Sequence, residues 1–391
     1  MLGDRMVAVA LAFAVLEVGG SASEVGLVLA AAVFPLVGSV LVGGVVADRV
    51  SRRAVMIHAD LVRLVSQGMM AALLISGVAE VWMLALLAGV TGAATGFFNP
   101  ASTGLLPEVV SPEQLQPANA LRGSAVSAGE ILGPLAAGVL VATAGAGWAI
   151  AVDAATFAVS AACLTMLRVP GRAAPEPSSF VADLREGWVA FRSRTWVWAF
   201  VVYFAIANAL WGAWSALGPI VADRDLGGAA AWGVVLGAVG VGALVGSLFA
   251  TRLKPGRPLV FVALTDGLFA LPLAFLAAGS SVPLLACGAF LSGAGMMLGM
   301  SVWESTLQRD IPPEALSRVS SYDWFGSFAF YPLGLAIWGP VAAAIGIGAS
   351  LWLAFALVVA AILALLAVPE IRRHPAAPTV EPRGPASHAP G

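Results

Sequence analysis

The chain has 391 residues, of which 60% are hydrophobic and only 11% are charged, and its net charge at neutral pH is −2. Soluble domains carry about 25% charged residues, so this composition excludes a soluble enzyme or a soluble binding domain. The apolar residues form runs of helical length, which predicts an all-α membrane protein with many spans.

Twelve membrane spans are predicted from the apolar runs and the residues that interrupt them. In chain order they cover 1–18, 25–47, 54–76, 81–103, 119–144, 147–168, 196–221, 230–252, 258–278, 282–307, 317–344 and 347–368. They group into an N-terminal six-helix bundle (1–168), a cytoplasmic linker (169–195), a C-terminal six-helix bundle (196–368) and a disordered cytoplasmic tail (369–391).

The first span is unusual because only 11 uncharged residues, Met6 to Leu16, follow Gly3-Asp4-Arg5. This run is too short to cross a bilayer alone. Two interpretations remain open. One is a signal peptide with a small-residue cleavage region at 21–23. The other, which we favour, is a truncated first helix in which Asp4 lies at mid-membrane depth. N-terminal sequencing would separate them.

Positive charge is distributed very unevenly among the predicted loops. Sixteen of the 20 Lys and Arg residues fall in segments that share one side of the membrane, and the opposite loops hold only Arg224. Because basic residues concentrate in cytoplasmic loops, this distribution predicts that both termini are cytoplasmic.

The turn between the second and third spans carries the most specific motif of the chain. Its pattern Gly-x-x-x-Asp-Arg-x-x-Arg-Arg resembles the signature loop of the major facilitator superfamily, with Ser51 where the family more often has Gly. The resemblance implies two six-helix bundles around a central cavity, and a cytoplasmic latch that closes when the cavity opens outward. The residues concerned are Gly44, Asp48, Arg49, Arg52 and Arg53.

A second motif lies in the fifth span, where Glu130 is surrounded by Gly129, Gly133, Pro134 and Gly138. Proline bends a helix and glycine allows another helix to approach closely. The pattern is similar to the span-5 motif of superfamily antiporters and exporters. We expect Glu130 to be buried and to exchange a proton during transport.

Acidic residues within spans are costly and therefore need a reason. Besides Glu130, the proton-coupling candidates are Asp4, Glu304 and Asp323, although the last two could instead make gate contacts to Arg309 or Arg318. The acids of the third, sixth and ninth spans are expected to be structural. Among these, Asp60 should pair with Arg63 three residues away, and Asp153 should lie in a wet outer position.

Polar and aromatic residues at mid-span positions suit a largely apolar organic substrate. The alternative for each is an interfacial aromatic belt or helix packing. The candidates are Asn99, Asn208, Trp211, Trp214, Trp303 and Tyr322.

The two halves of the chain also resemble each other. Pro-Glu-Gln-Leu at 112–115 follows the fourth span, and Pro-Glu-Ala-Leu at 313–316 follows the tenth span, 201 residues later. Repetition in the same inter-span loop indicates an internal duplication.

The overall arrangement resembles bacterial exporters of the enterobactin and macrolide efflux type within the superfamily. This implies a secondary active transporter, working as a monomer in the bacterial plasma membrane, that exports a small organic molecule in exchange for protons. No enzyme activity, cofactor, metal site or nucleic-acid partner is expected, since the two cysteines fall inside spans and the three histidines are scattered. An importer of the same fold and a non-transporting membrane sensor are the alternatives.

Overall fold

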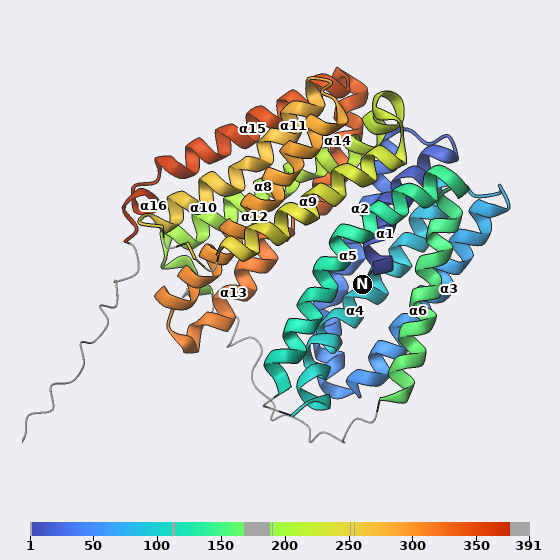
Figure 1. Ribbon diagram of the computed structural model, residues 1–391. Helices are drawn as coiled ribbons and strands as arrows, with labels where there is room; N and C mark the ends of the chain where they lie inside the picture. The colour runs from blue at the N-terminus through green and yellow to red at the C-terminus, as the bar shows by residue number, and fades with distance from the viewer. Residues whose placement is uncertain are drawn as a thin grey trace, which may run out of the picture.

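The computed structural model describes residues 2–111, 114–167, 188–189, 191–250, 252–253 and 255–375. Most of the predicted linker and the end of the predicted tail lie outside the described residues. Within them, all regular structure is helical and falls into two bundles (Figure 1). The N-terminal bundle contains α1 (Leu2–Glu17), α2 (Ala22–Arg49), α3 (Arg52–Ile75), α4 (Val81–Val109), α5 (Leu115–Ala144) and α6 (Ala146–Met166).

The C-terminal bundle follows a similar plan with more interruptions. It contains α8 (Thr195–Val221) with a π-helical extension, η2 (Ala222–Leu226), then α9 (Ala229–Ala250), α10 (Pro258–Asp266), the 3₁₀ turn η3 (Gly267–Phe269), α11 (Ala270–Ala277), α12 (Val282–Asp310), α13 (Pro313–Phe328), α14 (Tyr331–Ile345), α15 (Ile347–Ala367) and α16 (Pro369–Arg373).

Local sequence explains where several helices begin. The Ser21 hydroxyl accepts a hydrogen bond from the Glu24 amide at 3.4 Å, and the Ser21 amide donates to the Glu24 carboxylate at 2.7 Å. This reciprocal capping box satisfies two amides at the start of α2 that have no helical partner. At the start of α3 the Ser51 hydroxyl accepts from the Ala54 amide alone, without the reciprocal bond.

The ninth and eleventh spans are broken, although we expected each to be a single helix. The ninth is divided into α10, η3 and α11, and the eleventh into α13 and α14. Pro272 and Pro332 explain both breaks, because neither can donate the backbone hydrogen bond that the residue four positions earlier would accept.

Turn geometry supports the internal duplication. Gly145 between α5 and α6 has φ +93°, and Gly346 between α14 and α15 has φ +87°, a left-handed conformation that favours glycine. Each of these amides also donates to the carbonyl four residues earlier. The two glycines are 201 residues apart, the same spacing that separates the repeated loop sequences.

Ten of the helical segments in the described residues are long and apolar enough to cross a membrane. Helix α1 falls outside this group because it has only 16 residues. Helix α3 is long enough, but Asp60, Arg63 and its other polar residues lower its hydropathy. The count of twelve spans therefore stays a prediction.

The first residues after the last span differ from the expected disordered tail. They form the short helix α16, in which Ile371 is fully buried. His374 follows it and lies 2.8 Å from the carboxylate of Asp310 at the end of α12. The apolar contact and the polar contact together hold residues 369–375 against the bundle.

Candidate functional site

An ion pair lies where the two bundles meet. Arg5 of α1 donates to the Glu130 carboxylate of α5 at 3.0 Å, and the two side chains are 51% and 36% exposed. Helix α1 packs against α5 and α6 of its own bundle and also against α8 and α9 of the other. The pair therefore lies inside the fold yet remains accessible. The expectation of a buried Glu130 was wrong, because Arg5 holds its carboxylate at a position where both side chains are partly exposed.

A second charged group is sealed behind α1. Arg63 is 3% exposed; it donates to Asp60 one turn earlier on α3 and lies 3.4 Å from Asp4 of α1. Its guanidinium is also stacked between two aromatic rings, 4.1 Å from the centre of Phe98 and 4.3 Å from that of Phe157. The predicted Asp60–Arg63 pair is confirmed.

The environment of Asp153 contradicts the expectation of a wet outer position. The residue is fully buried on α6, and the amide of Gln67 on α3 donates to its carboxylate at 3.1 Å. The difference arises because α1 covers this part of α6: the backbone at Gly3 leaves no room for a side chain above the Asp153 carboxyl group.

The glycines of the α5 motif lie at the contact between the bundles. A Cβ added at Gly138 would lie 2.7 Å from the carbonyl oxygen of Ala229 and 3.1 Å from the Cα of Gly233 on α9. One added at Gly240 would lie 2.7 Å from the carbonyl oxygen of Glu130. Gly129, Gly133 and Pro134 are buried on the same helix. The motif thus provides the close helix approach that its composition predicts.

The predicted latch makes contacts within the N-terminal bundle. The Arg52 side chain donates to the Gly104 carbonyl and lies 3.2 Å from Glu108 of α4. Arg53 donates to the carbonyl oxygens of Leu164 and Thr165 at the end of α6. The structure does not describe the side chains of Asp48 and Arg49 or the surroundings of Gly44, so the proposed latch remains a prediction for these residues.

Three of the predicted site residues in the C-terminal bundle lie in the protein core instead of lining a cavity. Trp214 is 1% exposed and packs against Trp232 with ring centres 4.6 Å apart. Trp303 is equally buried and donates its indole N–H to Asp323 at 3.0 Å. Asp323 also accepts from Ser327, so its described partners are neutral side chains. Arg309 pairs with Asp310 instead, and the structure does not describe the side chain of Arg318. Large rings in this apolar bundle gain more from burial than from lining a cavity.

The remaining candidates are spread over several places. Asn99 and Glu304 are exposed, and Trp211 is partly buried against Phe269. Asn208 donates to the Phe204 carbonyl of its own helix. Tyr322 lies 5.6–5.7 Å from the rings of Trp188 and Phe191, which belong to the predicted linker.

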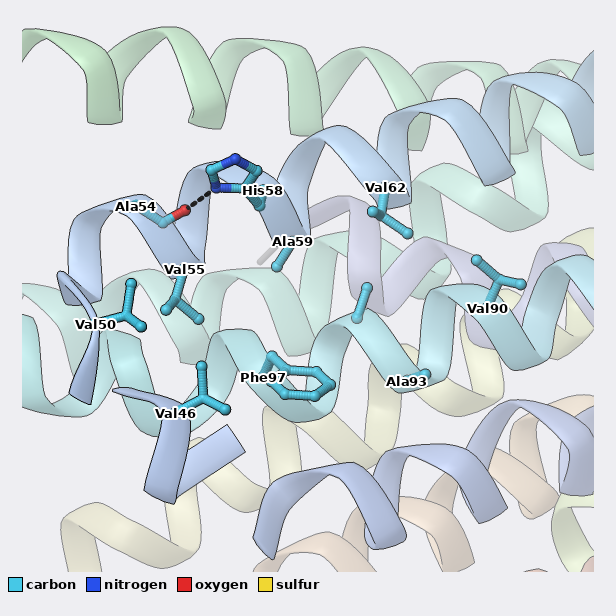
Figure 2. Close-up of a pocket in the computed structure, with 11 residues that line it drawn as sticks. Val46, Val50, Ala54, Val55, His58, Ala59, Val62, Val90, Ala93 and Phe97 are labelled. Atoms are coloured by element: carbon cyan, nitrogen blue, oxygen red, sulfur yellow. Dashed lines mark hydrogen bonds between the residues drawn. The ribbon is translucent and has the colours of Figure 1, made fainter. Parts of the chain in front are cut away.

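Two grooves are found in the described part of the structure. An apolar groove of about 520 Å³ lies among α2, α3 and α4, and among its described lining residues His58 is the only ionisable one (Figure 2). It contains none of the predicted site residues. A second groove of about 470 Å³ is lined by both bundles, and its lining is Ser124, Ser127, Ala128, Ile131 and Leu132 of α5 and Leu244 of α9.

Sequence reasoning underestimated two residues of this region. The sequence shows Arg5 at the start of the first span but does not indicate its partner, because the pairing with Glu130 connects positions 125 residues apart. Gln67 was not singled out, since an uncharged amide within a span gives no strong signal. Two bundles of long apolar helices, with an ion pair between α1 and α5 near the contact of the bundles, define an integral membrane protein of the transporter class.

Comparison with known proteins identifies the family. Residues 1–329 match the Major Facilitator Superfamily. The multidrug efflux pump Tap of Mycolicibacterium fortuitum is 28% identical over 89% of this chain and 88% of its own length. The enterobactin exporter EntS of Salmonella choleraesuis is 30% identical over 88% of this chain and 83% of its own. The chain therefore belongs to the Major Facilitator Superfamily and is a secondary transporter.

Solved structures agree on the fold. A bacterial homologue of the human lysosomal transporter Spinster, described as inward-facing and unoccupied, aligns with a TM-score of 0.68 over 95% of this chain and 96% of its own. A POT family transporter in complex with 5-aminolevulinic acid aligns with a TM-score of 0.73 over 95% and 94%. Sequence identities of 13% and 12% limit these likenesses to the fold.

Proposed function

We propose that this transporter exports small, largely apolar organic molecules in exchange for protons. The relatives that match over most of their length are named as a multidrug efflux pump and as enterobactin exporters. The groove between α5 and α9 has an apolar lining with two serine hydroxyls. Such a lining favours a lipophilic molecule with few polar groups.

The observation that carries proton coupling is the accessible Arg5–Glu130 pair. The ion pair requires an ionised carboxylate, and a proton on Glu130 removes the charge that holds Arg5. Proton binding therefore releases α1 from α5 at the point where the bundles meet. In our proposal a proton from outside enters in exchange for the substrate, and its release to the cytoplasm restores the pair.

The proposal includes the orientation of the protein in the membrane and its cellular location. Basic residues concentrate in the loops at the end of the fold where the linker lies, so we place that end and both termini in the cytoplasm. The protein would work as a monomer in the bacterial plasma membrane. Each bundle then moves against the other about the contacts of α5 with α9 and of α2 with α14.

Inverted membrane vesicles test this function. With an imposed pH gradient, acid inside, wild-type vesicles should accumulate a lipophilic fluorescent cation such as ethidium, and dissipating the gradient should abolish accumulation. Glu130→Gln should fold and reduce gradient-driven accumulation at least tenfold, because the neutral amide cannot exchange a proton. A panel of apolar dyes extends the assay to other substrates.

Two outcomes would contradict the proposal. Full gradient-driven accumulation by Glu130→Gln would remove Glu130 from proton coupling. Movement of the whole dye panel in the same direction as protons would indicate an importer. Asp310→Asn is the matched control, because Asp310 also pairs with an arginine, Arg309 at 2.6 Å, but lies at the far end of α12. This variant should retain wild-type accumulation.

A further inference from the structure

The junction of α1, α3 and α6 contains a buried carboxyl group that forms no ion pair among the described residues. Asp153 is fully buried, and its described polar partners are the Gln67 amide at 3.1 Å and the Thr156 hydroxyl at 3.4 Å. Gln67 itself is 1% exposed, and its Oε1 acceptor has no hydrogen-bond partner among the described residues. A hydroxyl on a protonated Asp153 would supply the missing donor.

The local charge balance also requires a proton. Of the charged side chains on the helices packed against α6, Asp4 of α1 and Arg63 of α3 interact electrostatically with Asp153. Asp60 shares the same guanidinium, so two positive charges, Arg63 and the amino terminus, face three carboxyl groups. From α5, Glu130 is already engaged by Arg5. An uncompensated buried carboxylate is so costly that the group takes up a proton instead.

Helix α1 connects this sealed region to the accessible ion pair. Three successive residues each contact a different helix: Gly3 lies against the Asp153 carboxyl group of α6, Asp4 against Arg63 of α3, and Arg5 against Glu130 of α5. Because a helix moves as a rigid element, a change at any one of these contacts is transmitted to the other two.

We propose that Asp153, with Gln67, forms a second and sealed proton site, whose occupancy is transmitted through α1 to the Arg5–Glu130 pair. The inference rests on the proposed exchange of substrate for protons and adds a residue that couples the two. Asp4, whose side chain is 38% exposed, lies between solvent and the sealed acids and is the entry point for the proton.

Infrared difference spectroscopy of the purified full-length protein tests the site without any substrate. A protonated carboxyl group has a carbonyl-stretch band that vanishes on ionisation. The wild-type protein should show such a band, with an intensity that changes with pH, and Asp153→Asn should lose it. Gln67→Leu should shift the band, because the carboxyl group loses its amide partner. An unchanged band in Asp153→Asn would overturn the proposal.

Reconstituted vesicles test the coupling. Asp153→Asn preserves the side-chain shape and can donate to Gln67, so it should fold and exchange ethidium across the membrane at equal pH. Its accumulation driven by a pH gradient should fall at least tenfold. Gly3→Ala should likewise retain exchange at equal pH and lose accumulation driven by a pH gradient, because its methyl group must displace the Asp153 carboxyl group. Every titratable group remains in this variant.

The matched control is Asp266→Asn in the other bundle. Asp266 is a carboxyl group in a span that accepts a hydrogen bond from the Tyr203 hydroxyl at 2.7 Å, and it lies outside the contacts of α1. This variant should keep both exchange at equal pH and accumulation driven by a pH gradient. Wild-type gradient-driven accumulation by Asp153→Asn would overturn the coupling role alone. Failure of the wild-type protein to transport any of the dye panel would instead contradict the proposed function, and the infrared result would still decide the proton site.

Discussion

At the scale of single residues, Arg53 shows how the basic turn supports its own bundle. Its guanidinium donates to the carbonyl oxygens of Leu164, at 2.7 Å, and of Thr165. These carbonyls belong to the last turn of α6, where helical donors run out; the Leu164 carbonyl also accepts from the Leu167 amide at 3.3 Å. A cation at this end is also favoured by the helix dipole.

Arg53→Ala should therefore loosen the end of α6. Hydrogen bonds from a charged donor contribute about 1.5–3 kcal/mol each when partly buried, and the accessible part of this site reduces that figure to about 1–2 kcal/mol in total. Hydrogen–deuterium exchange should become faster for the amides of residues 162–166 and stay unchanged in α3.

A matched arginine provides the control for this change. Arg372 donates to the Ala367 carbonyl at the end of α15, the counterpart of α6, but at 3.4 Å and in an exposed position. Arg372→Ala should leave exchange at the end of α15 within twofold of wild type. Equal acceleration in both variants would mean that any cation near a helix end has the same effect.

Residue-level contacts were predictable from sequence only where they are local. The spacing of Asp60 and Arg63 on one helix face predicts their pairing, and the structure confirms it. The Gln67–Asp153 and Arg5–Glu130 contacts connect residues 86 and 125 positions apart. No periodicity encodes such pairs, because the packing of α1 against α3, α5 and α6 determines them.

At the scale of helices, proline explains breaks only in combination with packing. Pro272 and Pro332 coincide with the interruptions of the ninth and eleventh spans. Pro35, Pro134, Pro219 and Pro340 instead lie inside continuous helices. Since the same residue type has both outcomes, sequence could predict the spans but not which of them would be divided.

The glycines of α5 allow a prediction at this scale. Gly138→Ala places a methyl group 2.7 Å from the Ala229 carbonyl oxygen, whereas a methyl group at Gly123 of the same helix has no atom within 4 Å. Replacing glycine by alanine stabilises a helix by about 1 kcal/mol at either position. Gly123→Ala should therefore keep or raise the melting temperature, and Gly138→Ala should lower it and slow transport.

Thermal unfolding and dye export by the two variants provide the measurement. The comparison separates contact between the bundles from the intrinsic preference of glycine, because both substitutions lie on α5 and add the same methyl group. A Gly138→Ala protein as active and as stable as Gly123→Ala would show that α5 and α9 do not need their close approach.

At the scale of the whole molecule, the bundles are joined at one end. Extensive contacts between them involve α5 with α9 and α2 with α14, supplemented by α1 and α8, whereas the extensive contacts of α10, α12 and α13 in the described residues lie within the C-terminal bundle. Gly26, Gly138 and Gly339 lie in the helix halves remote from the linker and contact the opposite bundle. Figure 1 shows the bundles diverging toward the ends where α5 begins and α9 ends. In the orientation that we propose, this form is open to the cytoplasm.

This arrangement accounts for how far sequence analysis could reach. Apolar runs and their breaks predict the helices, and the repeated loop predicts two related halves. The relative tilt of the halves depends on contacts between distant glycines and on the state that the transporter occupies. A latch between the halves is not formed by the described side chains of Arg52 and Arg53, because the cytoplasmic ends lie apart.

A distance measurement tests the predicted rearrangement. Leu121 of α5 and Gln308 of α12 are exposed near the ends of opposite bundles that we propose to be cytoplasmic. Spin labels at these positions should show a second, shorter distance when proton or substrate conditions favour the outward-open form, because the bundles rock about their α5–α9 and α2–α14 contacts. The exposed Cys163 and Cys287 must first be replaced by serine.

Labels at Leu121 and Met166, both exposed in the N-terminal bundle, provide the control. Their distance should stay constant because each bundle moves as a rigid body, so a change confined to the first pair reports relative motion of the two halves. Constant distances for both pairs at every pH and dye concentration, in protein that transports the dye, would contradict alternating access by rocking. A change within the N-terminal pair would locate the motion inside that bundle, at the α1 junction rather than between the halves.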